Sequence, residues 1–169
     1  MPSNSKKLDQ QCTENRAFIR QLETPWKMWL YFLTKLPSAL FWGFRVKKVN
    51  AKASEVSIPF NWRTQNPFRS IYFAAQAGAA EFSTGILANI ARHGRGPISM
   101  LVLDFRAEFV KKANTTTTFT CEDGDKVNEA IEKAVASGEG QIVNMTSIGR
   151  NKAGEMVSKI QITWTFKIK

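Results

Sequence analysis

One acidic residue stands alone in the longest apolar helical pattern of the chain. Glu81 is the only Asp or Glu between Arg69 and Arg92, a stretch dominated by Ala, Gly and larger apolar residues. Burying an ionised carboxylate among apolar groups costs free energy, so the pKa of Glu81 should lie above that of an exposed glutamate. A carboxylate with a raised pKa suits a general base that works near neutral pH. Glu81 is therefore the first candidate catalytic residue.

The residues that precede this pattern add groups able to polarise a carbonyl. The expected helix start, near Ile71 to Ala74, leaves backbone N–H groups unpaired at the positive end of the helix dipole. The amides of Phe73 and Ala74 can hold a carbonyl oxygen and the charge it gains on attack. Asn66, in the loop before the helix, can orient a water molecule or the carbonyl. The set suits attack on an acyl group, either by water that Glu81 activates or by Glu81 itself.

The same residues also have a structural interpretation. A single glutamate in a buried helix is often paired with an arginine or a hydroxyl group, and in a dimer Arg106 or Arg45 could be that partner of Glu81. Asn66 precedes Pro67, and Asn-Pro is an ordinary turn sequence. The residues themselves leave both interpretations open.

The elements that must position these groups follow from periodicity and turn residues. Strand-like runs cover 46–51, 56–60, 101–109, 115–121, 141–148 and 156–168. Apolar and polar residues alternate over 56–60, 101–109 and the last run, and β-branched residues are enriched over 115–121. Helical spacing covers 17–22, 25–36, 70–92 and the stretch between Asp123 and Gly138. The 70–92 pattern is apolar on every side, so its helix must be buried on every side. One antiparallel sheet curled around this helix meets these burial demands and predicts an α+β fold.

The order of these elements and the apolar central helix resemble the hotdog fold over roughly residues 26–168. In hotdog thioesterases of the phenylacetate-degradation type, an Asn is followed three residues later by Gly, then by His-Gly-Gly, then by an acidic residue on the helix. This sequence has Asn66, Arg69 at the first Gly position, Tyr72-Phe73-Ala74 in place of His-Gly-Gly, and Glu81 at the acidic position. The stretch is even more similar to an uncharacterised, thioesterase-like hotdog family.

The resemblance implies a hydrolase for thioesters of coenzyme A or of an acyl carrier protein, with coenzyme A as part of the substrate and no cofactor. Glu81 and Asn66 are then catalytic, the amides of Phe73 and Ala74 form the oxyanion site, and substrate binding is expected at Tyr72, Arg69 and Arg95. Hotdog sites usually form between two subunits, so a homodimer or a dimer of dimers is expected. The alternative is a non-catalytic acyl- or lipid-binding protein, because Phe73 adds bulk where the related enzymes keep the backbone bare.

Composition and charge set the remaining expectations. With 43% hydrophobic and 22% charged residues, the 169-residue chain reads as a disordered leader over 1–15 followed by one domain over 16–169, with the 25–36 helix as an N-terminal addition. No apolar run approaches the roughly 20 residues that span a bilayer, and a cytoplasmic protein is expected. The net charge of +10 suits coenzyme A phosphates, with Arg92, Lys111 and Lys112 as further candidates. It also permits a nucleic-acid or membrane-surface binder, although the basic residues are scattered and no nucleic-acid motif is present.

Cysteine and histidine point to no metal site. Cys12 and Cys121 lack the spacing of metal ligands and are expected to be free thiols. His93 is the only histidine and stands beside Gly94 at the expected end of the central helix, where a cation is favoured by the carbonyl end of the helix.

Overall fold

The computed structural model of the protein describes residues 15–169, so the leader expected over 1–15 lies outside the described residues apart from Asn15. Residues 15–23 are helical. The elements that follow are α2 (Pro25–Lys35), α3 (Pro37–Trp42), β1 (Arg45–Val49), β2 (Ser54–Ile58), α4 (Phe73–Arg92), β3 (Ile98–Phe109), β4 (Thr117–Cys121), α5 (Gly124–Ser137), β5 (Gln141–Arg150) and β6 (Met156–Ile168). The predicted α+β architecture with an additional N-terminal helix is confirmed.

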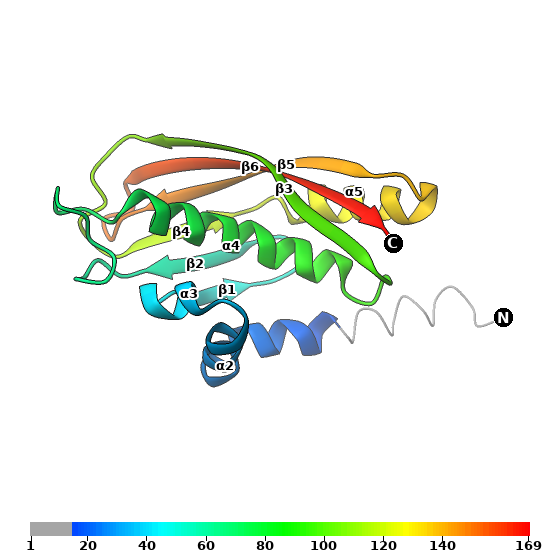
Figure 1. The fold of residues 1–169 in the computed structure, drawn as a ribbon, viewed down its shortest axis with the longest axis horizontal. Helices are drawn as coiled ribbons and strands as arrows, with labels where there is room; N and C mark the ends of the chain where they lie inside the picture. The colour runs from blue at the N-terminus through cyan, green and yellow to red at the C-terminus, as the bar shows by residue number, and fades with distance from the viewer. Residues whose placement is uncertain (1–14) are drawn as a thin grey trace.

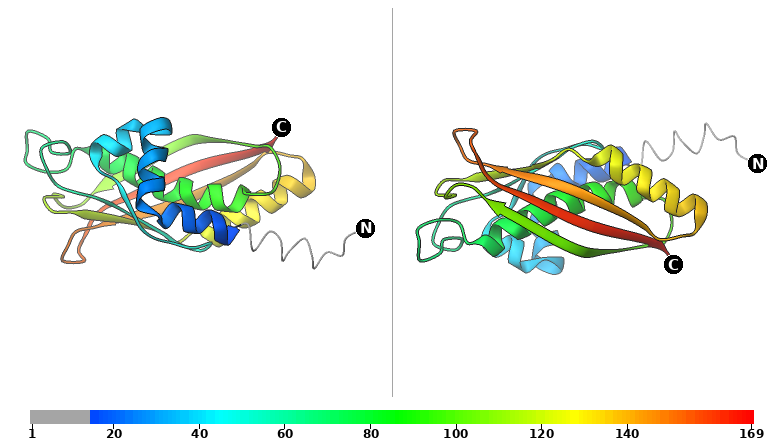
Figure 2. Two further views of the ribbon diagram at one scale, coloured as in Figure 1. Left: turned by 90° about the horizontal axis from the view of Figure 1, so that it is seen from below. Right: turned by 90° about the horizontal axis from the view of Figure 1, so that it is seen from above.

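The strands form one antiparallel sheet in the order β1-β2-β4-β5-β6-β3, which leaves β1 and β3 as its two edges. The sheet curves around α4, which lies along its concave face (Figure 1). The N-terminal helices cover the other side of α4, and α5 lies toward its C-terminal end (Figure 2). The central helix is therefore enclosed, as its apolar pattern predicts.

Small residues on α4 allow its neighbours to approach closely. Ala75, Ala79, Ala80 and Ala88 are fully buried. A Cβ atom added to Gly78 would lie 3.0 Å from Cζ3 of Trp42, so the glycine makes room for the indole ring of α3. Larger side chains fill the space between α4 and the N-terminal helices. Phe82 of α4 packs edge-on against Phe32 of α2, with ring centroids 5.2 Å apart. These contacts join the N-terminal helices to the core.

Buried polar side chains connect α4 to the sheet at three points. The Ser83 hydroxyl lies 2.8 Å from the Ser147 hydroxyl of β5, and its carbonyl accepts a hydrogen bond from Ser54 of β2. Nearer the start of α4, Oε1 of Gln76 accepts a hydrogen bond from Ser158 of β6. Thr84, next to Ser83, accepts one from the indole N–H of Trp164 of β6. Each buried polar group thereby gains the partner that burial demands.

The edge strand β3 exposes apolar side chains that an isolated chain leaves in water. Leu101, Leu103, Phe105 and Phe109 are all more than 40% exposed. The strand is 12 residues long and pairs only with β6, so its outer row of backbone groups has no strand partner within residues 15–169. Long, apolar, unpaired edges are templates for pairing with another chain.

Three local features go beyond the sequence patterns. Pro37 follows the 25–36 helical pattern and occupies the first turn of α3, a short helix that the patterns did not predict, where its missing N–H costs nothing. The central helix begins at Phe73, within the start expected near Ile71 to Ala74 but three residues after the beginning of the 70–92 pattern, and the Ile71 amide before it donates to the carbonyl of Ala113. Thr24 precedes α2 without capping it, since its hydroxyl donates back to the carbonyl of Arg20.

Candidate active site

The loop between β2 and α4 is organised by the side chain of Asn66. Its Oδ1 accepts hydrogen bonds from the amides of Phe68 and Ser70, at 3.0 and 3.1 Å, and from the Ser70 hydroxyl at 3.2 Å. The oxygen therefore has the turn-forming role that Asn-Pro suggested. The Nδ2 amide has no acceptor among residues 15–169, so Asn66 retains a free donor.

Arg69 has a backbone conformation that explains its place in the motif. Its φ is +57°, and among the described residues it is the only non-glycine with positive φ. A side chain in this region costs roughly 1–2 kcal/mol because Cβ crowds the carbonyl oxygen. Arg69 occupies the position where the resemblance expects glycine, and the backbone keeps the conformation that glycine would favour.

The start of α4 presents unpaired amides, as the sequence predicts. The carbonyl of Tyr72 accepts from the amides of Ala75 and Gln76, and the Tyr72 side chain does not cap the helix. The amides of Phe73 and Ala74 have no acceptor among residues 15–169. The exposed rings of Tyr72 and Phe73 pack edge to face, with centroids 4.8 Å apart, beside this helix end. Donors suited to an oxyanion are therefore in place.

A cavity of about 700 Å³, here called the loop groove, opens at this end of the molecule. It lies between residues 65–73 and the segment 109–113 that follows β3, and its lining includes Asn66, Tyr72, Phe73, Gln76 and Lys112. Gln76 was not predicted as a site residue. It is buried and hydrogen-bonded to the Ile71 carbonyl and to Ser158, so it fixes the loop and α4 in place. The sequence could have indicated this role, because Gln76 is a side-chain amide within a largely apolar helical pattern.

Glu81 lies in the middle of α4, half-buried and turned toward β6. The position that a Cβ would take on Gly85 is 3.7 Å from Oε1 of Glu81 and 3.8 Å from Cζ2 of Trp164. No ion pair or hydrogen bond reaches the Glu81 carboxylate from any residue in 15–169; neither Arg45 nor Arg106 does so. Burial raises the pKa of Glu81 above its ordinary value of 4.5. The predicted direction of this pKa shift is confirmed.

One chain does not bring Glu81 to the loop groove. Glu81 is eight residues beyond Phe73, which corresponds to about 12 Å along a helix that rises 1.5 Å per residue. A carbonyl held by the Phe73 and Ala74 amides is therefore out of reach of the carboxylate of the same chain. The residues proposed from sequence form two separate groups along α4.

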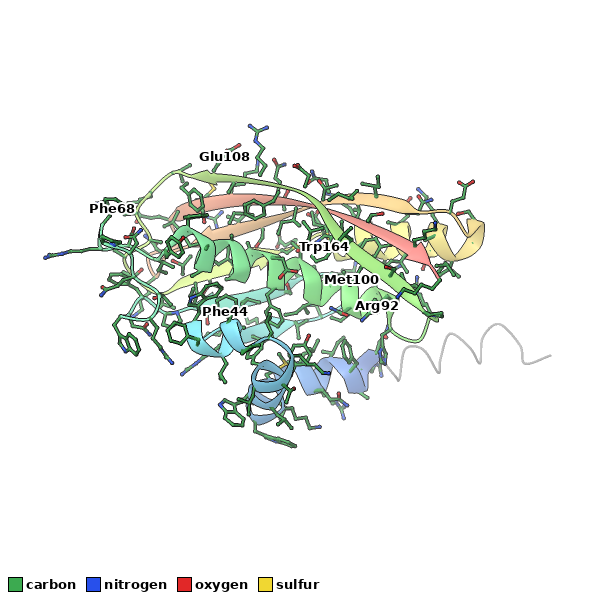
Figure 3. The ribbon with its side chains drawn as sticks, in the orientation of Figure 1. Phe44, Phe68, Arg92, Met100, Glu108 and Trp164 are labelled. Atoms are coloured by element: carbon green, nitrogen blue, oxygen red, sulfur yellow. The ribbon has the colours of Figure 1, made fainter. Side chains whose placement is uncertain are left out.

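Arg95 belongs to neither group. In Figure 3, Phe68 and Arg92 mark opposite ends of the molecule, and Arg95 lies just beyond Arg92 in the chain. Its guanidinium donates to Asn128 at 2.8 Å and to Glu132 at 3.2 Å, on α5. Within one chain, therefore, Arg95 lies far from Arg69 and Tyr72, at the other end of α4.

The remaining chemically versatile residues have structural surroundings. His93 stacks on Phe18 with ring centroids 4.6 Å apart. Cys121 is a buried free thiol whose pKa burial raises to about 12. Within residues 15–169, no three His, Cys, Asp or Glu side chains cluster closely enough to bind a metal ion. None of the helices in this range combines the length and apolar composition needed to cross a bilayer.

Comparison with known protein families identifies the family of this chain. Residues 26–166 match the model of a domain of unknown function, DUF4442. The chain belongs to the DUF4442 family. No curated protein sequence matches it.

Solved structures confirm the hotdog fold of this DUF4442 protein. A Chlorobaculum tepidum protein of unknown function superposes with a TM-score of 0.73 at 11% identity, covering 87% of this chain and 98% of its own. A thioesterase from Haemophilus influenzae superposes with a TM-score of 0.63 at 14% sequence identity, covering 81% of this chain and 87% of its own. A thioesterase from Staphylococcus aureus superposes with a TM-score of 0.58 at 12% sequence identity, covering 76% of this chain and 97% of its own. Two variants of the latter replace a glutamine and a glutamate that are 15 positions apart.

Proposed function

We propose that this DUF4442 protein hydrolyses acyl thioesters, of coenzyme A or of an acyl carrier protein, in a site shared by two copies of the chain. The observation that carries the proposal is the carboxylate of Glu81, which is half-buried, unpaired among residues 15–169 and raised in pKa. An ionised carboxylate that is partly buried and unpaired lowers the stability of the fold, and carboxylates of this kind are typical of catalytic sites. The 15-residue separation of Asn66 and Glu81 equals that of the two residues altered in the Staphylococcus aureus thioesterase.

The chemistry requires a base, an oxyanion site and water. Glu81 accepts a proton as water adds to the thioester carbon, and the Phe73 and Ala74 amides stabilise the charge that develops on the carbonyl oxygen. The carbon–sulfur bond then breaks, and the thiolate takes up the proton, which gives a carboxylic acid and a free thiol. The Nδ2 group of Asn66 is available to orient the water or the carbonyl.

The edge strand β3 supports the shared site. If two copies pair antiparallel along β3 with the two-fold axis at Phe105, Asp104 faces Arg106 of the second copy on both sides of the axis. This register matches opposite charges across the interface. It also brings the exposed Phe105 side chains of the two copies side by side.

The same register relates Glu81 to the loop groove of the second copy. Trp164, which lies beside Glu81, pairs with Val102 of β3. Because β3 has a bulge between Val102 and Asp104, Val102 would lie opposite Ala107 of the second copy, two residues from Phe109, which lines the groove of that copy. The pairing would thus bring the carboxylate of one copy toward the oxyanion donors of the other, which the separation of about 12 Å prevents within one chain.

Basic residues near the loop groove suit a phosphorylated substrate. Lys112 lines the groove, and Arg69 is exposed on the adjoining loop. Lys111 also lines it but is engaged with Glu155 at 2.6 Å. Lys112 and Arg69 are thus the better candidates for the phosphates of coenzyme A.

A second candidate function, acyl binding without turnover, is favoured by one observation. The Tyr72 and Phe73 side chains place two exposed rings beside the oxyanion donors. The resemblance implies histidine and glycine at these two positions in the related enzymes. A protein that kept the fold and lost hydrolysis would hold an acyl chain against these rings.

The deciding experiment measures thiol release from short, medium and long acyl-CoAs and compares Phe73→Pro with Phe73→Ala. Proline is tolerated at the first position of a helix, and Tyr72 already has the extended ψ of 137° that precedes proline. Phe73→Pro therefore removes one oxyanion donor while both variants lose the ring. Loss of about a hundredfold or more in kcat in the proline variant relative to the alanine variant supports the proposal. Absence of turnover across the panel, with saturable acyl-CoA binding, would instead establish the binding function.

A further inference from the structure

The N-terminal helix α2 is apolar on two opposite faces. Met28 and Phe32 lie one turn apart and are buried against the core. Trp26, Trp29, Leu30 and Leu33 occupy the opposite side of the helix at helical spacing and are between 47% and 65% exposed. The fold uses only the inner face, so the outer face is left for something outside the chain.

A second aromatic pair extends this surface. Phe41 of α3 and Trp62 of the loop between β2 and α4 pack edge to face, with ring centroids 6.1 Å apart, and both are more than half exposed. Together with the outer face of α2, they form what is called here the aromatic face. The helices α2 and α3 project from the side of the molecule opposite β3 (Figures 1 and 3), so the aromatic face stays accessible when two copies pair along β3.

Positive charge is concentrated in the same part of the chain. Residues 15–69 hold ten Lys or Arg and two Glu, a net charge of +8, whereas residues 70–169 hold twelve basic and ten acidic residues, a net charge of +2. Of those ten basic residues, only Lys52 has an ion-pair partner within 15–169. The basic residues are therefore less evenly scattered than the sequence pattern suggested.

The charges and the aromatic face meet at one groove. A cavity of about 460 Å³, here called the basic groove, runs between α2 and the edge strand β1. Apolar groups including Met28, Phe32 and Phe44 line its interior, and Trp29, Arg45, Lys47 and Arg63 also line it. Lys48 is exposed on the same strand, and the ammonium of Lys27 lies 5.6 Å from the Trp26 ring centroid.

We infer that the aromatic face and the basic groove dock this protein on an anionic lipid bilayer. Trp and Tyr favour the membrane–water boundary, where their rings contact acyl chains and their polar atoms stay hydrated. Lys and Arg around them are attracted to the negative lipid surface by about 1 kcal/mol each, or roughly fivefold in binding. A helix with this pairing of apolar and basic groups lies in the plane of the interface.

The charge argues against a second copy of the chain as the occupant. A two-fold contact through this surface would set Arg45, Lys47 and Lys48 of one copy near the same residues of the other, and like charges in an interface disfavour association. Nucleic acid would satisfy the charge, but it offers no apolar medium for Leu30 and Leu33. An anionic bilayer satisfies both requirements. The inference is independent of the proposed hydrolysis.

The test measures co-sedimentation of the full chain with vesicles of phosphatidylcholine alone and of phosphatidylcholine mixed with phosphatidylglycerol. We expect binding to the anionic vesicles, with a blue shift of tryptophan emission, and at least about tenfold weaker binding to the neutral ones. Lys47→Gln with Lys48→Gln should weaken binding about thirtyfold, since two near-surface charges are lost. The matched control, Lys152→Gln with Lys167→Gln, removes the same charge from exposed positions elsewhere and should change binding less than about twofold, because solution ions screen distant charges.

The apolar contribution is tested with Trp26→Ser combined with Leu30→Ser, against Ile142→Ser as an exposed apolar control. Loss of the blue shift and of vesicle binding in the α2 variant alone supports the inference. Equal binding to both vesicle types, or unchanged binding in the α2 and Lys47/Lys48 variants, would overturn it. If the α2 variant changes the molecular mass measured by light scattering but not vesicle binding, the aromatic face is a contact between copies of the chain and the inference is overturned. Binding of the natural protein to duplex DNA in place of vesicles would also overturn it. Should the α2 variant fail to fold, the lysine variants decide alone.

Discussion

Replacing Glu81 with glutamine should lower activity and raise stability together. The carboxylate lies half-buried beside Gly85 and Trp164, with no partner among residues 15–169, and burial raises its pKa. A raised pKa means that the folded state binds the proton more tightly than the unfolded chain does. Well below pH 4.5 both states are protonated, and Glu81 then has little effect on stability. As the pH rises, the unfolded chain ionises first, and the free energy of unfolding falls until the pH passes the folded pKa.

The magnitude follows from this linkage. Each unit by which the folded pKa exceeds the ordinary value of 4.5 lowers the free energy of unfolding by about 1.4 kcal/mol once Glu81 is ionised. Glutamine keeps the shape and cannot ionise, so Glu81→Gln recovers this amount at neutral pH and gains little well below pH 4.5. The same substitution removes the general base, which should lower kcat by about a hundredfold or more.

The assay combines denaturant unfolding at several pH values with acyl-CoA hydrolysis at saturating substrate, using Glu139→Gln as the control. Glu139 is exposed, so its replacement should alter neither measurement. Hydrolysis by the natural protein should rise with pH through a midpoint above 4.5. If Glu81→Gln is less stable than the natural protein at neutral pH, the ionised carboxylate has a stabilising partner, such as Arg106 of a second copy. That result, or undiminished hydrolysis by the variant, would refute the argument for a strained catalytic base.

Three further predictions concern other parts of the molecule. Arg69→Gly should raise the free energy of unfolding by about 0.5–1 kcal/mol in denaturant titrations, because relief of the positive φ exceeds the added entropy of the unfolded chain; a less stable variant would mean that the Arg69 side chain has its own stabilising contact. Asp104→Arg should convert a dimer to monomers in light scattering, since it opposes Arg106 on both sides of the axis, and adding Arg106→Asp should restore the dimer; an unchanged mass in the single variant would contradict the proposed register. Cys121, with a pKa of about 12, should resist iodoacetamide in the native protein at pH 8 and react once unfolded; prompt native labelling would show that β4 opens readily.

Much of the fold follows from local patterns. The strands were predictable where apolar and polar residues alternate or β-branched residues are enriched, and α4 because a 20-residue apolar stretch with small residues has no exposed face. The short helix α3 was missed because Pro37 signals both the end of one helix and the start of the next. The start of α4 was placed correctly near Ile71 to Ala74, but the bond from the Ile71 amide to the distant Ala113 carbonyl is a tertiary contact that local residues do not encode.

The site was predictable in its parts and not in its arrangement. The raised pKa of Glu81 and the free amides of Phe73 and Ala74 follow from one buried carboxylate and one helix end. That these groups lie about 12 Å apart also follows from helix geometry, yet it becomes informative only beside the exposed β3 edge. Arg95 was grouped with Arg69 by charge alone, and its pairing with Glu132 on α5 depends on long-range packing.

The polar contacts that tie α4 to the sheet have a consequence for motion. Sliding or turning α4 would break the Ser83–Ser147, Gln76–Ser158 and Thr84–Trp164 hydrogen bonds together, and each buried group left unsatisfied costs about 1–3 kcal/mol. Movement of the helix that carries Glu81 is therefore costly. Opening is expected in the layers outside it, the loop over residues 59–72 and the N-terminal helices, and deuterium should enter these long before it reaches the hydrogen-bonded amides of α4.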